Sequence, residues 1–377
     1  MERNKVHLGD VCKVVSGSTP KTGIPEYWNG DIKWITPAEI QEDSFYIYDS
    51  VRHITLLGKE KTGLSYMPKG TVILSSRAPI GKTAITGCEM CCNQGFKNLI
   101  CSDKIFNEYL YYFLKGKEKY LNSLGRGATF KEISKKIVED IEIPLPNIKE
   151  QKHIATVLGC IDRVISLRQQ QLAKLDELVK ARFVEMFSDT RAEEPLATLC
   201  TFIDYRGKTP EKAERGLPFI TAKNIKMHHM SFETKEFISK ETYDKVMTRG
   251  FPKVGDVVFT TEAPLGNVCR IPYMKTEFYI GQRIITMQTK ALEPVYLEYA
   301  LSSDDFKRKI LEKSSGSTVT GIRSKLLEQL TIPVPPIAQQ QKFAAFVGQI
   351  EKIRLFIQKN IEKIETLKKA LMQKYFE

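Results

Sequence analysis

The chain contains an internal repeat, which constrains its fold more than any other feature of its 377 residues. The segment GRGATFKEISKKIVEDIEIPLPNIKEQKHIA, which begins at Gly125, matches SGSTVTGIRSKLLEQLTIPVPPIAQQQKFAA, which begins at Ser315. Within these segments Pro144 and Pro333 lie 189 positions apart. A chain made of two copies of one unit is expected to fold as two similar domains, each with a core of its own.

Earlier segments of the two copies also match, in the same order. The pairs are SGSTPKTG with DYRGKTPE, IKWITPAEI with LPFITAKNI, MPKGTVILSSRAPIGKTAI with FPKVGDVVFTTEAPLGNVC, and NQGFKNLI with GQRIITMQ. Runs such as TVILSS and DVVFTT are typical of short strands, so the first part of each copy is predicted to be β-rich with a few helices. One helix is expected to begin at Thr129-Phe130-Lys131-Glu132, which has the spacing of a capping box.

Each copy ends in a segment that predicts one long helix. Residues 149–187 contain no proline and would span ~58 Å at ~1.5 Å per residue, and 339–376 is the counterpart. Apolar residues recur there at spacings of three and four, with Arg168, Arg182 and Asn360 as polar interruptions. This pattern favours pairing of the two helices as an antiparallel coiled coil, although each helix could instead pack on its own domain. The expected pairing residues are Leu158, Ile161, Ile165, Leu172, Leu175, Val179, Ile350, Ile353, Ile357, Ile364, Leu367 and Leu371.

The predicted fold class is α+β, with two β-rich α/β domains in a tandem pseudo-repeat, each followed by a long helix. The expected divisions are 1–148 for the first domain, 149–188 for its helix, 189–338 for the second domain and 339–377 for the second helix. A hydrophobic content of 42% is ordinary for a globular chain and lets each domain bury a core.

The stretch SSRAPIGKT, at 75–83, resembles the end of a nucleotide-binding P-loop. Such a loop needs a glycine where this chain has Ser76, and Pro79 lacks one of the amides that would surround a phosphate. The second copy replaces Gly81-Lys82-Thr83 with Gly266-Asn267-Val268, so the lysine and the hydroxyl are both lost. The repeat therefore predicts a Pro-Gly turn between two strands rather than a phosphate site.

Composition favours a basic, cytoplasmic protein. The net charge is +12 and the pI is about 9.1, which suggests a polyanionic partner such as duplex DNA. No apolar run approaches the ~20 residues of a membrane helix, and the N-terminus leads into no signal-peptide core. Eight cysteines with unpatterned spacing fit a reduced protein better than a disulfide framework.

The order of these motifs resembles the specificity (S) subunit of type I restriction–modification systems over essentially the whole chain. In the first copy the resemblance rests on SGSTPKTGIPEYWNGDIKWITPAEI, SSRAPIG, NQGFKNLI, GATFKEISKKIVEDIEIPLP and the following Glu150-Gln151. The second copy is more diverged, because it lacks the Tyr27-Trp28 pair and has three glutamines at 339–341. Such divergence is expected if the two domains recognise different sequences.

The resemblance implies a bacterial defence protein with no catalytic residues of its own. Each globular part would be a target recognition domain for one half of an interrupted double-stranded DNA site, and the paired helices would set the spacing. Two methyltransferase subunits would dock on the helices, and restriction–translocase subunits would join the full complex. S-adenosylmethionine, ATP and magnesium would belong to these partners, which carry the adenine-N6 methyltransferase and ATP-dependent endonuclease activities. Neither a cofactor nor a metal is expected on this chain.

Candidate DNA contacts are hydrogen-bond donors on loops between the β elements, although any single one could be an ordinary solvated side chain. They are Ser18, Thr19, Lys21, Thr22, Arg77, Asn93, Gln94, Lys97, Arg126, Thr129 and Lys131 in the first copy, and Arg206, Lys208, Thr209, Gln282, Arg283, Ser317, Thr318 and Arg323 in the second. Glu262 stands where the first copy has Arg77, and a carboxylate there could accept a hydrogen bond from cytosine or repel phosphate.

Other interpretations stay open at this point. Tyr27, Trp28 and Trp34 could stack on bases, but such residues are more often part of a core. Cysteines at 88, 91, 92 and 101 could suggest zinc, but the second copy has one cysteine in the comparable region. Two further classes of function are a nucleotide-dependent nuclease that uses 81–83, and a scaffold that binds no nucleic acid.

Overall fold

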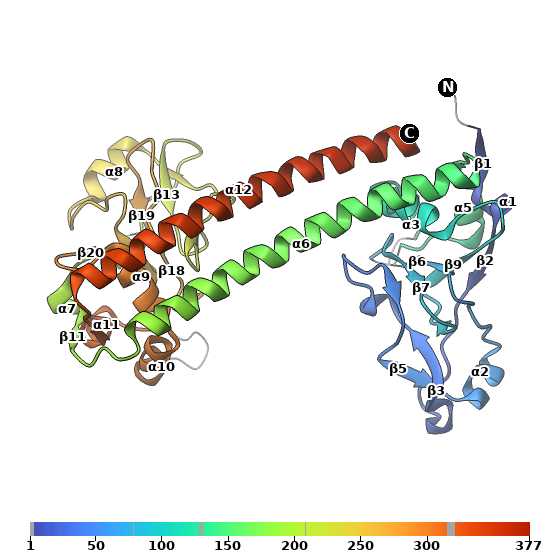
Figure 1. The fold of residues 1–377 in the computed structure, drawn as a ribbon, viewed down its shortest axis with the longest axis horizontal. Helices are drawn as coiled ribbons and strands as arrows, with labels where there is room; N and C mark the ends of the chain where they lie inside the picture. The colour runs from blue at the N-terminus through green and yellow to red at the C-terminus, as the bar shows by residue number, and fades with distance from the viewer. Residues whose placement is uncertain (1–3, 78, 128–130, 208, 315–320) are drawn as a thin grey trace. The chain divides into compact units, whose positions relative to one another are not determined.

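The computed structural model describes residues 4–77, 79–127, 131–207, 209–314 and 321–377 (Figure 1). The chain forms two compact units. One comprises Met1–Gln169 together with Lys359–Glu377, and the other comprises Gln170–Gln358. Each unit therefore contains one globular domain and a part of both long helices. Among the described residues, no helix combines the length and the apolar character needed to cross a bilayer.

The first domain is built on a five-stranded sheet with the order β2-β9-β6-β7-β4. A three-stranded sheet, β5-β3-β8, extends from it, and β1 pairs with β10. The strands are β1 (Lys5–His7), β2 (Cys12–Ser16), β3 (Trp28–Ile35), β4 (Tyr46–Ile47), β5 (Arg52–Ile54), β6 (Val72–Ser75), β7 (Thr83–Thr86), β8 (Cys91–Cys92), β9 (Phe96–Cys101) and β10 (Glu142–Pro144). The helical elements are α1 (Leu8–Val11), η1 (Pro25–Tyr27), η2 (Pro37–Glu39), α2 (Leu56–Thr62), α3 (Asn107–Gly116), α4 (Glu118–Leu124) and α5 (Lys135–Glu139).

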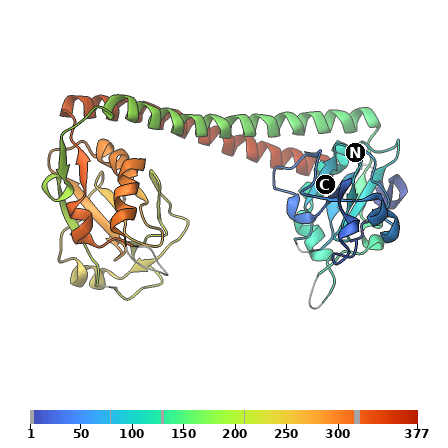
Figure 2. The same cartoon turned by 90° about the horizontal axis from the view of Figure 1, so that it is seen from below.

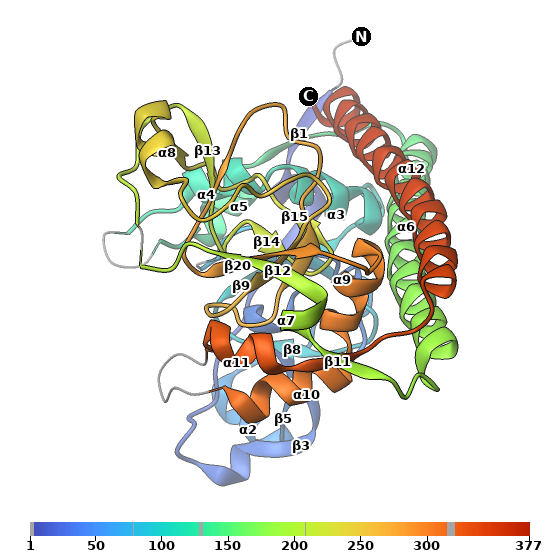
Figure 3. The ribbon, with the colours of Figure 1, turned by 90° about the vertical axis from the view of Figure 1, so that its left-hand side faces the viewer.

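The second domain repeats this plan with the sheet β12-β20-β17-β18 (Figure 3). Strands β12 and β20 are neighbours in it, as β2 and β9 are in the first domain. Smaller sheets are β16-β13-β19, β14-β15 and β11-β21. The strands are β11 (Glu193–Pro195), β12 (Cys200–Asp204), β13 (Leu217–Ile220), β14 (Ile225–Lys226), β15 (His229–Met230), β16 (Phe237–Ile238), β17 (Val257–Thr260), β18 (Val268–Arg270), β19 (Tyr279–Ile280), β20 (Ile284–Thr289) and β21 (Thr331–Pro333). The helices are α7 (Leu196–Leu199), α8 (Lys240–Val246), α9 (Pro294–Ser302), α10 (Asp304–Lys313) and α11 (Ser324–Gln329). The predicted α+β class and tandem repeat are confirmed.

The helix expected to begin at 129–132 does not begin at Lys131 or Glu132, and Thr129 and Phe130 lie outside the described residues. Helix α5 begins at Lys135, and the Ser134 hydroxyl accepts a hydrogen bond from the Ile137 amide at 3.2 Å. Glu132 instead exchanges backbone hydrogen bonds with Arg126, at 2.9 and 3.0 Å. A serine cap lay two residues beyond the capping-box motif, and the backbone of Glu132 was already committed to a β-bridge.

Two helices of 40 residues follow the domains, α6 (Ile148–Phe187) and α12 (Ile337–Phe376). Their bounds differ by the same offset as the two copies of the sequence repeat. A buried glutamine in the first turn anchors each helix to its own domain. The Gln151 side chain accepts from the Phe106 amide at 2.8 Å and donates to two carbonyls, and that of Gln340 accepts from the Glu293 amide at 3.0 Å. A buried amide that makes these bonds is costly to replace, so it fixes where each helix starts.

Within each unit, the segments of α6 and α12 lie side by side and run antiparallel (Figure 2). In the first unit, Lys368 of α12 pairs with Asp162 of α6. In the second unit, Arg354 of α12 pairs with Asp176 of α6. The later aspartate of α6 thus pairs with the earlier cation of α12, as an antiparallel pair requires.

Two of the predicted pairing residues lie off the helix seam. Ile353 and Leu367 are 47% and 53% exposed, whereas the other ten predicted positions are buried or half-buried. The next residues, Arg354 and Lys368, occupy the seam instead, because their aliphatic stems can cover apolar surface while their charged ends reach an aspartate. The spacing of apolar residues therefore predicts the wrong seam residue at these two positions.

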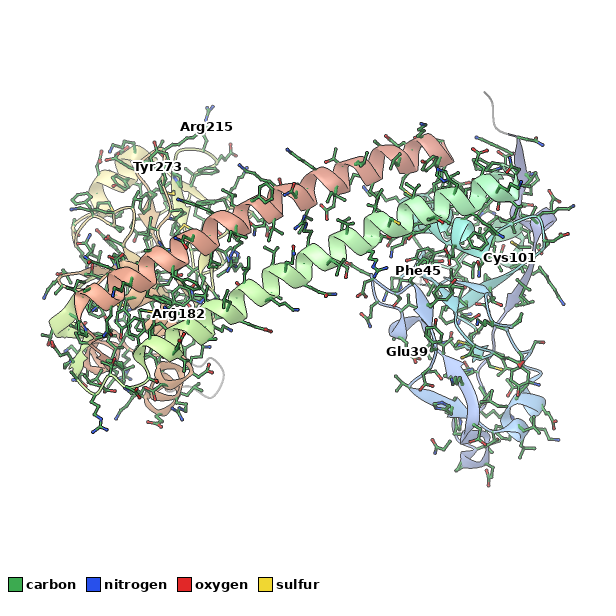
Figure 4. All side chains as sticks on the ribbon, in the orientation of Figure 1. Glu39, Phe45, Cys101, Arg182, Arg215 and Tyr273 are labelled. Carbon is green, nitrogen blue, oxygen red and sulfur yellow. The ribbon has the colours of Figure 1, made fainter. Side chains whose placement is uncertain are left out.

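The three predicted polar interruptions differ in position. Arg168 and Asn360 are half-buried, as seam residues would be. Arg182 is exposed (Figure 4). It pairs with Glu185 on its own helix at 2.8 Å. Only two of the three therefore interrupt the apolar seam.

The ends of the helices enter the domain cores. The first core includes Ile154 and Leu158 from the start of α6 and Phe376 from the end of α12. The second core includes Phe343 from the start of α12 and Phe187 from the end of α6. Each helix thus packs on its own domain at one end and on the other domain at its far end, in addition to pairing with its partner helix.

We predict that Phe376→Ala lowers the free energy of unfolding by about 3–5 kcal/mol, because it leaves a cavity beside Tyr109 and Phe113. Phe187, the equivalent residue of α6, packs on Tyr296 and should give a loss of similar size. Urea denaturation of the full chain measures both. Leu367→Ala is the matched control on α12, because its side chain is half exposed; an equal loss in the control would contradict the prediction.

Candidate nucleic-acid interface

One edge of the main sheet in the first domain collects most of the predicted contact residues. Ser16 at the end of β2 and Leu74 near the end of β6 both lie opposite Lys97 at the start of β9. The loops that join these strand ends therefore meet at one place. Backbone hydrogen bonds join them further, from the Ser76 amide to the Gly95 carbonyl at 2.7 Å and from the Ile133 amide to the Ser76 carbonyl at 2.9 Å. Loops held on a rigid sheet are a common location for binding residues.

The loop after β2 is held by two buried tryptophans. The Trp34 indole donates to the Ser18 carbonyl at 2.9 Å, and the Trp28 indole donates to the Lys21 carbonyl at 3.2 Å. The rings pack edge to face at 5.2 Å, so both belong to the core, as expected, and neither is placed to stack on a base. The Thr19 hydroxyl hydrogen-bonds the Gln94 side chain, which joins two predicted groups.

Gly17 lets this loop approach the chain at 92–93 closely. A Cβ atom at this position would lie 2.0 Å from the Asn93 carbonyl oxygen, which no backbone tolerates. The Ser18 amide also donates to the Cys92 carbonyl at 3.0 Å. The close approach depends on the missing side chain, so glycine is required here for a steric reason.

A charged cluster lies beside these loops. The Glu132 carboxylate accepts from Arg77 Nε at 2.9 Å and from Lys97 Nζ at 3.1 Å. Burial opposes ionisation of Glu132, but the hydrogen bonds from Lys97 and Arg77 outweigh it and lower the pKa of the carboxyl group. Lys97 is buried, so its ammonium group supports the cluster from below, while Arg77 is half exposed.

The second domain builds the same edge from other side chains. The Thr261 amide donates to the Arg283 carbonyl at 2.9 Å, and the Ile322 amide donates to the Thr261 carbonyl at 3.0 Å. These bonds correspond to those of Ser76 in the first domain. Arg283 pairs through Nε with Glu262 at 2.9 Å.

The loop after β12 in this domain is held by charged residues rather than by tryptophans. Arg206 pairs with Asp204 at 2.7 Å, and its hydrogen bonds hold the pKa of that carboxyl group low although burial opposes ionisation. Arg249 donates to the carbonyls of Asp204 and Arg206, at 2.8 and 2.9 Å. The motif comparison did not single out Arg249, because it lies between the segments that match in the two copies.

The remaining predicted contacts are placed as follows. Lys21, Thr22, Gln94, Arg126, Lys131, Thr209 and Arg323 are exposed, and Ser18, Thr19, Asn93 and Gln282 are half-buried. Thr129, Lys208, Ser317 and Thr318 lie outside the described residues. The part of the prediction that can be located thus gathers at one sheet edge in each domain.

The Gly81-Lys82-Thr83 stretch forms a turn between strands. Lys82 Nζ donates to the Ile40 carbonyl at 2.8 Å, and β7 begins at Thr83 where a P-loop would begin a helix. The lysine is therefore occupied by the fold, and the predicted strand-to-strand turn is confirmed.

All eight cysteines are free thiols. Burial raises the pKa of Cys91 to about 11 and that of Cys92 to about 12, so both are protonated at neutral pH. Within the residues that the structure describes, no group of three or more His, Cys, Asp or Glu side chains is arranged to hold a metal ion.

Comparison with known proteins gives one consistent family. The model of the type I restriction modification DNA specificity domain matches residues 2–177 and 197–366. The specificity subunit of the type I restriction enzyme MjaIX from Methanocaldococcus jannaschii is 28% identical, over 97% of this chain and 91% of that protein. The MjaVIII specificity subunit of the same organism is 24% identical, over 97% and 90%.

Solved structures have the same fold. The S subunit of a type I restriction–modification system from M. genitalium aligns with a TM-score of 0.56 at 16% identity, covering 100% of this chain and 97% of that one. A chain from a structural study of assembly and conformational transition of the type I system aligns with a TM-score of 0.64 at 19% identity, covering 99% and 97%.

We predict that Gly17→Ala disrupts the interface loop, with a loss of about 1–3 kcal/mol in stability, because its Cβ would collide with backbone at Asn93. Thermal unfolding and retention on duplex DNA measure the effect. Gly23→Ala in the same loop is the control, because nothing lies within 4 Å of its Cβ position. If the two variants behave alike, the steric argument is incorrect.

Proposed function

Because this chain belongs to the type I restriction–modification DNA specificity family, we propose that each of its two globular domains reads one half of an interrupted DNA site. The observation that carries the proposal is that equivalent loops meet at the same edge of the main sheet in both domains. The backbone bonds of Ser76 in the first domain have counterparts at Thr261 in the second. The side chains on this common frame differ, with Arg77 in one domain and Glu262 in the other.

Such an arrangement suits two DNA-binding domains that dock on the duplex in the same way but recognise different base sequences. Shared backbone geometry would set how each domain sits on the duplex, and the variable side chains would contact base edges. The net charge of +12 would supply attraction to the phosphates that does not depend on sequence. Exposed cations such as Lys21, Arg126 and Lys131 are suited to that part.

The paired helices are proposed to set the distance between the half-sites. Each has 40 residues and so spans ~60 Å. Their antiparallel ion pairs and the burial of both helix ends oppose sliding of one helix along the other. A spacer of constant helix length would give a gap with a constant number of unread base pairs.

The outer faces of the helices support docking of two copies of one partner, for which we propose methyltransferase subunits. The first unit exposes Val164 and Leu167 of α6 with Leu367 of α12. The equivalent positions in the other copy of the repeat are Ile353, Phe356 and Leu178, which the second unit exposes. Two equivalent apolar surfaces on one chain fit two identical partners, because exposed patches of this type mark interaction sites.

The chain is the non-catalytic specificity component of a type I enzyme. Adenine-N6 methylation and ATP-dependent cleavage are therefore proposed to take place on methyltransferase and restriction–translocase partners. Those subunits would bind S-adenosylmethionine, ATP and magnesium. We expect the assembly to act in the cytoplasm, where the DNA is.

Mapping of methylated adenines in host DNA, with and without this chain, tests the proposal. We expect methylation in the presence of the chain at one two-part sequence with a gap of constant length. Both halves and the gap should vanish when the chain is deleted and return when it is restored. Methylation without a two-part consensus, or with a variable gap, would contradict the proposal.

The docking surfaces make a separate prediction. Leu167→Glu should weaken binding of one methyltransferase subunit by about tenfold or more, and Phe356→Glu should weaken the other, because each places a charge in an apolar contact. Light scattering of the purified complex would then show one bound partner in each single variant and none in the double variant. Ala173→Glu, exposed on another face of α6, should keep both partners; loss of both partners in either single variant would contradict two independent sites.

A further inference from the structure

A carboxylate–arginine ion pair lies where the interface loops meet in both domains. The turn that supplies the arginine in the first domain supplies the carboxylate in the second. In the first domain the arginine comes from the turn after β6 and the carboxylate from the segment before α5. In the second domain the carboxylate comes from the equivalent turn after β17, and the arginine from the loop before β20. The two pairs therefore fill one location with the same chemistry from different positions in the repeat.

The backbone shows that the two locations are equivalent. Arg77 forms a β-bridge with Glu132, and Glu262 forms one with Gly321, which is the repeat counterpart of Glu132. Lys97 pairs with Leu74 in the sheet, and Ile285 pairs with Phe259 in the same way. The charge exchange between Arg77 and Glu262 is thus compensated within each domain, by Glu132 in one and by Arg283 in the other.

Both arginines are held in the same manner. Arg77 meets its carboxylate through Nε at 2.9 Å and its side chain is 47% exposed; Arg283 meets its carboxylate through Nε at 2.9 Å and is 52% exposed. A guanidinium group has five N–H donors, and a pair made through Nε uses one of them. The terminal amino groups then remain as donors with a fixed orientation.

Fixed terminal amino groups match the acceptor pair O6 and N7 of guanine in the major groove. A contact to phosphate suits these arginines less, because the carboxylate beside each one cancels its charge and would repel phosphate. The Arg283–Glu262 pair has no net charge, and the additional cation in the first domain, Lys97, is buried. Oriented donors whose charge is offset by a neighbouring carboxylate are better suited to reading a base than to general attraction.

We propose that Arg77 and Arg283 each read one guanine, and that Glu132 and Glu262 are positioning residues that orient these two guanidinium groups. This inference rests on the proposed function and names the base and the residues for each half-site. Because the arginines come from different strand ends, the guanine occupies a different place in each half. Lys97 has a supporting role, since it holds the second oxygen of Glu132.

The test uses the full chain with its methyltransferase subunits in a host that lacks adenine methylation. Arg77→Lys and Arg283→Lys keep the positive charge but remove the two-pronged donor set. Each should relax one G·C position by about tenfold or more, and the two variants should relax opposite halves of the site. Glu132→Gln should relax the same position as Arg77→Lys, and Glu262→Gln the same position as Arg283→Lys.

Arg308→Lys is the matched control, because Arg308 forms an exposed pair with Asp305 on α10 and is not one of the candidate contact residues. It should leave the consensus unchanged. A uniform loss of methylation at all sites in a lysine variant, with normal thermal unfolding, would indicate a phosphate contact and overturn the inference. An unchanged consensus, or relaxation at an A·T position, would also overturn it.

These outcomes separate the inference from the proposed function. If the unaltered chain directs methylation to no two-part sequence, the proposed function fails. If it directs methylation to a two-part sequence that the arginine and glutamate variants leave intact, only the guanine assignment fails. Complex formation with the methyltransferase subunits, measured for each variant, identifies any that do not fold.

Discussion

Each 40-residue helix must bury its apolar stripe, and its contacts with the two cores and with the other helix follow from this requirement. An apolar stripe of this length must be covered by other parts of the molecule. Each helix enters one core with its first turns, contacts the other helix through an ion pair in each unit, and enters the second core with its last residue, Phe187 or Phe376.

The same constraint explains why the two copies diverged unevenly. Residues that anchor the helices keep their chemistry, as in the buried pair Gln151 and Gln340 and in the tyrosines whose hydroxyl groups donate to Pro144 and Pro333. Residues of the interface loops differ between the copies, as at the equivalent positions Arg77 and Glu262, and their ion-pair partners come from different segments of the chain. Anchors must satisfy buried polar groups, whereas an exposed loop on the same frame can exchange its side chains at little cost.

Much of the architecture was predictable because repeats and helical periodicity are properties of sequence. The two domains, both long helices and their antiparallel pairing were expected, and so was the Pro-Gly turn at 79–81. The predictions were wrong where two nearby residues could occupy the same place in the structure. Ile353 and Leu367 fitted the apolar spacing, but the aliphatic stems and charged ends of Arg354 and Lys368 fitted the seam better. The helix expected to begin at 129–132 begins instead at Lys135, with Ser134 as its cap.

The tandem repeat, the length of the helices and the set of loops that gather polar residues can all be read from the amino-acid sequence, since each follows from local patterns that both copies contain. Which residues of those loops face each other depends on tertiary contacts. Glu132 had no visible role in sequence beyond a helix cap, yet in the fold it holds both Arg77 and Lys97. Arg249 lies outside the matched motifs, yet it closes the loop around Arg206. Contacts between residues far apart in the chain depend on how strand ends are brought together in the fold. Local sequence patterns contain no information about that arrangement.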